Sequence, residues 1–119
     1  MMIAVPAEEK GSAAAVSTRF ARAPWYVLYD SETGEWSALQ NVQALDSSQG
    51  AGIQAAQLLE RAQVRVVLTP HCGPKAFRVL QAASIAVCLA GGGTVEQVVG
   101  RYLAGELTPA TGADVEGHW

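Results

Sequence analysis

The stretch that decides the fold is "VRVVLTPHCGPKAFRVLQAASIAVCLA", residues 64–90. Two short apolar runs at its ends, 64–69 and 85–90, have the length and the β-branched content of buried strands. Between them, apolar residues recur at helical spacing over 73–83, and Pro74 suits the first position of a helix, where a missing N–H costs nothing. The stretch therefore predicts two parallel strands joined by a helix in a right-handed crossover.

The remaining segments extend this unit on both sides. Strands alternate in period two, whereas the helical segments from residue 50 onward follow a period of 3.6. Thr94 and Gln97 form a capping box, and Gly105 suits the position after the last turn of that helix. The expected fold is a three-layer α/β domain with a mixed, mostly parallel five-stranded sheet and helices on both faces. Further strands are expected at 2–7 (ended by Pro6), 25–30 and 35–42, a turn at 31–34, and helices at 50–62 and 94–105.

Composition narrows the class of protein. The chain has 119 residues, half of them apolar, and a formal net charge of −3. The mildly acidic balance argues against a nucleic-acid partner, and the longest apolar runs are far short of a membrane span. Two cysteines make no disulfide scaffold, and residues 1–10 do not read as a signal peptide. We expect a cytoplasmic domain over 1–105, a partly disordered tail over 106–119, and a monomer or weak dimer.

Four segments are expected to meet beyond the carboxyl ends of the strands, where ligands of such sheets bind. Three of these segments open helices, whose first N–H groups and partial positive charge suit an anion. Arg19, Arg22 and Lys75 would add formal charge. Glycines at helix starts are also ordinary loop residues, so an anion pocket and an empty crevice both remain open. The segments are the loop after Pro6, 47–52, 69–74 and 90–94.

The adjacent pair His71 and Cys72 suggests metal or thiol chemistry. Adjacent side chains on an extended segment point to opposite faces, and a closed zinc site needs about four ligands. Cys88 and His118 show no zinc spacing. Cys72 at a helix start would have a lowered pKa and be reactive, but no accompanying base and orienting group is evident. His71 is therefore interpreted as a polar pocket residue and Cys88 as a buried small hydrophobe; Trp25, Tyr26 and Trp36 are interpreted as sheet and core residues.

Five segments together resemble the dinitrogenase iron–molybdenum cofactor-binding family. The resemblance implies a ribonuclease-H-like three-layer fold and a non-enzymatic protein that carries, stores or helps to build metal–sulfur clusters. It extends to a small single-domain branch that includes a protein holding a molybdenum–copper sulfide cluster without covalent protein ligands. The segments are "MIAVP" (2–6), "VSTRFARAPWYVLYD" (16–30), "GAGIQAAQLL" (50–59), "VVLTPHCGPKAFRVLQAASIAV" (66–87) and "GGTVEQVV" (92–99); the tail "GELTPATGADVEGHW" (105–119) is also similar.

Two departures from the family pattern bear on how a cluster would be held. The family often has His-Phe-Gly-Arg where this chain has Arg-Phe-Ala-Arg at 19–22, and glycine where it has Pro70. An arginine is always charged and does not readily ligate metal, so electrostatic holding of a preformed anionic cluster is favoured. The implied cofactor is a molybdenum-containing cluster, of the Mo–Cu sulfide or Fe–Mo precursor type, exchanged with delivering or receiving proteins. The implied binding residues are Arg19, Arg22, Gly50, Ala51, Gly52, Thr69, His71, Cys72, Gly73, Gly92, Gly93 and Thr94, with His71 and Cys72 left open as metal ligands.

Two alternatives remain. One is a protein–protein scaffold with a degenerate pocket. The other is a ribonuclease-H-like nuclease, which needs clustered carboxylates for magnesium. The acidic residues that could serve, Asp30, Glu32, Glu35 and Asp46, lie on the predicted hairpin and its exit, and only Glu8 and Glu9 follow the first strand. Arg61 and Arg101 are expected on helices away from the mouth of the crevice.

Overall fold

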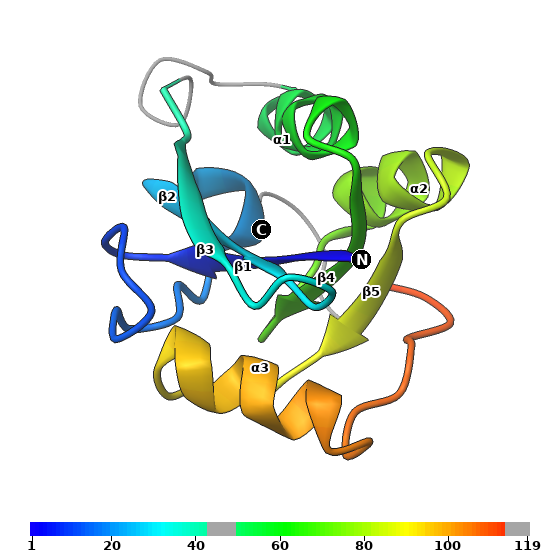
Figure 1. The fold of residues 1–119 in the computed structure, drawn as a ribbon. Helices are drawn as coiled ribbons and strands as arrows, with labels where there is room; N and C mark the ends of the chain where they lie inside the picture. Colours follow the sequence, from blue (N-terminus) through cyan, green and yellow to red (C-terminus); the bar gives the residue numbers. More distant parts are fainter. Residues whose placement is uncertain (43–49, 114–119) are drawn as a thin grey trace.

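The computed structural model describes residues 1–42 and 50–113. Its strands form one sheet in the order β3-β2-β1-β4-β5, with helices on both faces (Figure 1). This arrangement confirms the predicted α/β class and the five-stranded mixed sheet. The strands are β1 (Met2–Ala7), β2 (Trp25–Asp30), β3 (Trp36–Gln40), β4 (Val64–Thr69) and β5 (Ala86–Leu89).

The sheet has a parallel and an antiparallel half. β1 pairs with β4 and β4 with β5 in parallel, whereas the hairpin β2–β3 adds to β1 in antiparallel orientation. β1 has the predicted bounds 2–7, but Pro6 does not end it, because the strand continues to Ala7. Pro6 still pairs with Tyr26 of β2, but the paired register with β4 stops at Ala4. The missing N–H of Pro6 therefore interrupts no pairing with β4.

The helices occupy the predicted places, one or two residues shorter than expected at their ends. α1 and α2 lie together over one face, and α3 lies on the opposite face (Figure 1). The capping box of α3 is present, and Gly105 adopts a φ of 79°, as a left-handed residue after a helix does. The helices are α1 (Ala51–Arg61), α2 (Pro74–Ala82) and α3 (Val95–Leu103), preceded by a short 3-10 turn, η1 (Phe20–Arg22).

The core has two halves separated by the sheet. Alternate residues of β1 enter opposite halves: Ala4 packs with α1 and α2, whereas Ile3 and Val5 pack with α3. β4 divides in the same way, with Val67 on the first side and Val66 on the second. This period-two division is what the strand pattern in the sequence predicts for a sheet covered on both faces.

Part of the tail packs on the domain. The N–H of Ala110 donates to the carbonyl oxygen of Val87 at 2.7 Å, and Leu107 packs beside the α3 half of the core. Residues 114–119, including His118, lie outside the described residues, so the predicted partial disorder of the tail remains a prediction. The ribonuclease-H-like label likewise remains a prediction. Among the described helices none is long and apolar enough to span a membrane.

Candidate functional site

Buried polar side chains mark the carboxyl edge of the sheet. Within residues 1–42 and 50–113, the polar side chains that are buried belong to Ser17, Asn41 and Thr69. Burying such a group is costly unless it is hydrogen-bonded, so its partners indicate which part of the backbone it holds. All three have partners in the loops at this edge.

Asn41 and Tyr26 hold the turn that carries two arginines, residues 19–22, called here the arginine turn. The Asn41 amide Nδ2 donates to the carbonyl oxygens of Ala21 at 3.1 Å and Ala23 at 2.8 Å, and to the Tyr26 hydroxyl at 3.2 Å. The Tyr26 hydroxyl in turn donates to the carbonyl oxygen of Phe20 at 2.6 Å. These bonds hold the carbonyl oxygens of Phe20, Ala21 and Ala23, and so fix the backbone of the arginine turn next to β2. The Oδ1 of Asn41 is buried and accepts no hydrogen bond from the described residues.

Ser17 and Thr69 hold the neighbouring segments. The Arg19 N–H donates to the Ser17 hydroxyl at 3.3 Å, which fixes the entry to the arginine turn. Thr69, the last residue of β4, donates from its hydroxyl to the carbonyl oxygen of His71 at 3.0 Å. This bond bends the chain directly before the His71–Cys72 pair. Arg19 and His71, both predicted site residues, are thus positioned from buried anchors.

The first turns of α1 and α2 lie side by side at this edge. A Cβ added to Gly52 of α1 would lie 3.0 Å from the Cβ of Ala76 of α2, so the glycine permits the close approach of the two helices. Gly50 precedes α1 with a φ of 75°, and Gly73 precedes α2 in an extended conformation. Within the described part of the chain, the N–H groups of Ala51 and Gly52 have no acceptor outside their helix. Paired helix starts of this kind present several donors to one place.

Cys72 is fully buried, whereas its neighbour His71 is only half-buried. Cys72 belongs to the core cluster on the α1 and α2 side of the sheet, which also includes Ala21, Ala51 and Ala76. Burial raises the pKa of the Tyr26 phenol far above its usual value, and the nearby Cys72 raises it further. Cys88, as predicted, is a buried thiol, and burial raises its pKa.

The start of α3 differs from the other two helix starts. The N–H of Thr94 donates to Gln97 Oε1, and that of Val95 to the carbonyl oxygen of Ala14 at 2.9 Å. The next N–H, of Glu96, donates to Ser12. The Thr94 N–H that the sequence analysis placed among the ligand donors is therefore used within the protein. Gly92 and Gly93, both exposed, remain candidates at this side.

Arg101 and Trp36 do not lie where the sequence analysis put them. The Arg101 guanidinium donates to the carbonyl oxygens of Gly91 at 3.4 Å and Gly92 at 3.0 Å. Arg101 therefore reaches the loop before α3, and the expectation that it lies away from the mouth is wrong. Trp36 is 40% exposed and is not a core residue, whereas Tyr26 is fully buried as expected.

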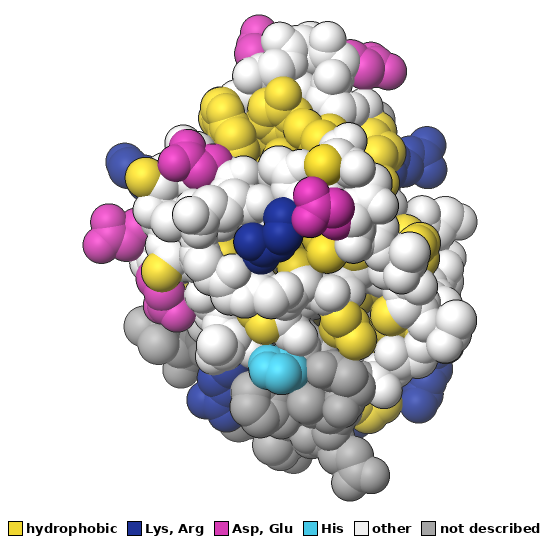
Figure 2. All heavy atoms as spheres, turned by 90° about the horizontal axis from the view of Figure 1, so that it is seen from below, with side chains coloured by type: hydrophobic (Ala, Val, Ile, Leu, Met, Phe, Trp, Pro, Cys, Tyr) yellow, Lys and Arg dark blue, Asp and Glu magenta, His cyan; other side chains and the backbone are white. Residues whose placement is uncertain are grey.

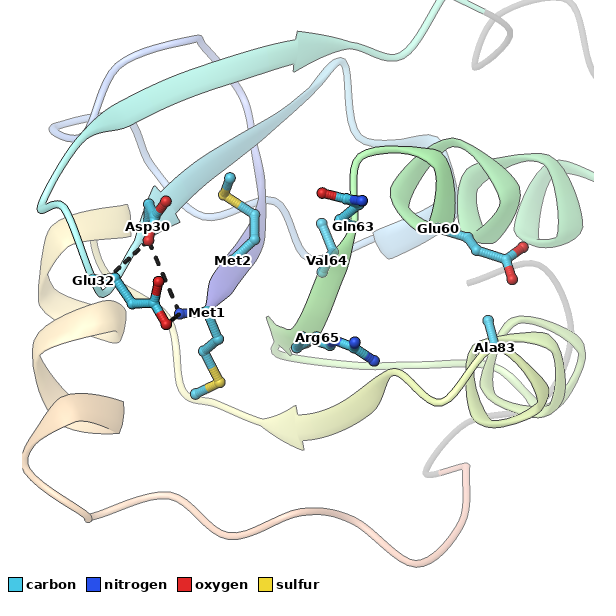
Figure 3. A pocket seen from close by; sticks show the side chains of 9 residues that line it. All are labelled: Met1, Met2, Asp30, Glu32, Glu60, Gln63, Val64, Arg65 and Ala83. Carbon is cyan, nitrogen blue, oxygen red and sulfur yellow. Dashed lines mark hydrogen bonds and ion pairs between the residues drawn. The ribbon is translucent and has the colours of Figure 1, made fainter.

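The opposite edge of the sheet has a different character. A cavity of about 530 Å³ there is lined by Met1, Asp30, Glu32, Glu60 and Arg65, among others (Figure 3). The terminal amine of Met1 lies 3.9 Å from both Asp30 and Glu32. Because three carboxylates line this cavity, it suits an anionic cluster less well than the carboxyl edge does.

The described residues do not supply a protein-built metal centre. No group of three or more His, Cys, Asp or Glu side chains lies close enough to hold a metal ion in 1–42 and 50–113. The carboxylate cluster that a nuclease needs is likewise not found there, and Asp46 lies outside the described residues.

Sequence reasoning missed the residues that hold the loops. Asn41 lies near the end of the strand predicted at 35–42, and nothing in the sequence marked it as buried. Its hydrogen-bond partners lie 15 to 20 residues away, which a local pattern does not reveal. Ser17 lies within the loop after Pro6, which the sequence already indicated as a ligand-binding segment.

Solved structures with the same architecture define the class of protein. The chain has 42% identity to the apo form of the orange protein from Desulfovibrio gigas, with a TM-score of 0.91 and 96% of each chain covered. It has 32% identity to a Thermotoga protein described under the name NifB, with a TM-score of 0.85 and 98% of each chain covered. A third, from Methanocaldococcus jannaschii, is 11% identical with a TM-score of 0.68 over 94% of this chain and 96% of that one, and shows the fold alone. A comparison with curated proteins gave no match.

A family model places the chain within this class. The model described as dinitrogenase iron-molybdenum cofactor matches residues 1–105. The protein belongs to this family, and the resemblance stated from the sequence is confirmed. The orange protein and the family description fit a cofactor-binding or carrier role.

Proposed function

We propose that the protein binds and carries an anionic, molybdenum-containing metal–sulfur cluster at the carboxyl edge of its sheet. The observation that carries the proposal is the use of its buried polar side chains. Ser17, Asn41 and Thr69 all hydrogen-bond to the loops of one edge. Fixing loops in this way costs conformational freedom and is typical of a site that must keep its donors in place.

The charges and donors at this edge suit a sulfide-rich cluster. Arg19 directly precedes η1 and Arg22 is its last residue, and η1 packs against α1. The paired starts of α1 and α2 add backbone N–H groups and partial positive charge. A cluster that brings its own sulfides needs neutralisation of charge and exclusion of water more than additional ligands, and contacts of this kind strengthen where water is excluded.

The identity of the cluster belongs to the proposal. The family description names an iron–molybdenum cofactor. A Mo–Cu sulfide and an Fe–Mo precursor are both sulfide-rich anions, and the arginine turn would serve either. In this account the protein performs no catalysis: it receives the cluster from one partner protein and delivers it to another.

The test compares arginines at the site with a matched arginine elsewhere. Arg19→Ala and Arg22→Ala should weaken retention of a reconstituted cluster, because each removes a charge from the arginine turn. If the bound cluster excludes water from the contact, each change should cost about 1.5–3 kcal/mol. Arg61→Ala is the control, since Arg61 is exposed in the last turn of α1, at the far end of that helix.

Arg101 is unsuited as a second control because it contacts Gly91 and Gly92. Retention is measured by visible absorption after desalting, with circular dichroism to verify the fold. Equal retention in the Arg19, Arg22 and Arg61 variants would end the electrostatic account.

A further inference from the structure

A second hollow lies on the opposite side of the sheet from the arginine turn. It has a volume of about 450 Å³, within the usual range of small-molecule sites. Part of its lining comes from the loop after β1, at Lys10, Gly11 and Ser12. The sheet contributes Trp25 of β2 and Trp36 of β3. Val27, Ser37 and Ala38 complete the lining.

The strand register places the two tryptophans on the same face of the sheet. Val5 of β1 faces α3 and pairs with Val27, so Val27 and its alternate neighbours Trp25 and Tyr29 lie on the α3 face. Tyr29 pairs with Trp36, which therefore lies on this face too. α3 packs on β1 and β4, and the β2–β3 part of the face extends beyond it. Figure 2 looks at the α3 side and shows a band of hydrophobic side chains across its upper part.

The exposed ring is held in a fixed position. Trp36 remains 40% exposed, yet its ring packs on Tyr29 with centroids 4.6 Å apart. A partly exposed indole that is held by a neighbouring ring offers a flat surface at little entropic cost when another ring stacks on it.

Lys10 brings a positive charge to this hollow. The Lys10 ammonium lies 5.9 Å from the centroid of the Trp25 ring. Within the described residues Lys10 makes no ion pair, although Glu8 and Glu9 precede it directly. Its charge is therefore available to an acidic group placed in the hollow. Ser12, from the loop after β1, also lines the hollow.

We propose that this hollow, called here the tryptophan groove, binds a small planar aromatic acid. The ring of the ligand stacks on Trp36, and its carboxylate pairs with Lys10 while remaining partly hydrated. A neutral aromatic ligand would not pair with the Lys10 ammonium, and a non-aromatic acid would not stack on Trp36. The site is separate from the arginine turn, because the sheet lies between Trp25 and Tyr26, which point to opposite faces.

The test is a two-dimensional amide NMR titration of the full chain with naphthoate. The amide signals of Lys10 to Ser12 and of Trp36 to Ala38, and the indole N–H of Trp36, should shift together. Naphthamide, which keeps the ring but lacks the charge, should bind roughly two- to five-fold more weakly, as expected for a partly exposed charge pair.

Two variants and a matched control separate the ring from the charge. Lys10→Gln should bring the affinity for naphthoate down to that for naphthamide. Lys75→Gln is the control, because Lys75 is the only other lysine and lies on α2. Trp36→Leu should weaken both probes by about three- to ten-fold, since it removes the stacking surface but keeps an apolar side chain.

Several results would overturn the proposal. Equal affinity for naphthoate and naphthamide, or an unchanged affinity in Lys10→Gln, would remove the role of the cation. Shifts confined to α1, α2 and the arginine turn would mean that the acid binds at the proposed cluster site. Concentration-dependent shifts of the groove signals without any probe would show that a second copy of the chain covers the groove instead.

Discussion

The hydroxyl group of Tyr26 donates a hydrogen bond of 2.6 Å to the carbonyl oxygen of Phe20, and so ties a core residue of β2 to the turn that carries Arg19 and Arg22. The two rings also contact each other, with centroids 5.4 Å apart. Phe20 anchors the turn in the core by its side chain and to Tyr26 by its backbone. The arginines on either side thus extend from a rigid base.

Asn41→Ala should destabilise the protein and loosen the arginine turn. The change removes the bonds to Ala21, Ala23 and Tyr26, and leaves buried carbonyl oxygens without a donor. We expect a loss of about 2–3 kcal/mol in the free energy of unfolding, measured by urea denaturation. Gln40→Ala is the control, since Gln40 is exposed on β3 and should change little. Equal stability of the two variants would show that the hydrogen bonds of Asn41 do not contribute to the free energy of unfolding.

The raised pKa of Tyr26 predicts a loss of stability in alkali. Its phenol holds its proton more tightly in the folded protein than in the unfolded chain, because burial disfavours the phenolate. The resulting stabilisation is fully present below the ordinary tyrosine pKa of about 10 and declines as the pH rises above it. Tyr26→Phe should lower stability at neutral pH but reduce its decline above about pH 10. Parallel pH profiles for the two proteins would contradict this.

Gly52→Ala should destabilise the contact between α1 and α2. The new Cβ would lie 3.0 Å from the Cβ of Ala76, so the helices must move apart, at a cost of about 1–3 kcal/mol. Gly100→Ala is the matched control, because Gly100 is in α3 and an added Cβ meets nothing within 4 Å. There the change should stabilise by about 0.5–1 kcal/mol. Thermal unfolding of both variants gives the comparison; a stabilised Gly52 variant would refute the packing role.

Cys72→Ser should leave most of the cluster binding in place. Cys72 is fully buried in a core cluster, so its side chain is not exposed to a ligand at the surface of the site. Gly73→Val should reduce binding more, because Gly73 is the buried residue directly before α2 and a branched side chain there would crowd the backbone donors. Visible absorption after reconstitution and desalting measures both. Loss of colour in Cys72→Ser with an intact fold would make Cys72 a direct ligand.

The fold could be predicted because its signals are local. The change of period at residue 50, Pro74 at the first position of α2 and the Thr94–Gln97 box each act within one turn or strand, and each lies where the sequence indicated. Pro6 was misjudged because its effect depends on a neighbouring strand. Pro6 is tolerated in β1 because the pairing with β4 ends at Ala4, before Pro6 is reached. The sequence does not reveal where this pairing ends.

The candidate site was predictable only in outline. Helix starts and arginines can be placed by topology, but their environment depends on distant partners. Thr94 and Arg101 illustrate this: the first has its N–H bonded to Gln97, and the second spans from α3 to Gly92. Gly52 illustrates the reverse, since a glycine expected to admit a ligand also admits a neighbouring helix at Ala76.

The most direct test of the account is elemental analysis, with a visible absorption spectrum, of the protein purified from its native host without added metal. We predict molybdenum together with acid-labile sulfide, and an absorption band in the visible region that is lost when Arg19 and Arg22 are both changed to alanine in the same host. A colourless protein without molybdenum or sulfide, purified under conditions that preserve its fold, would contradict the account and favour a scaffold with an empty pocket.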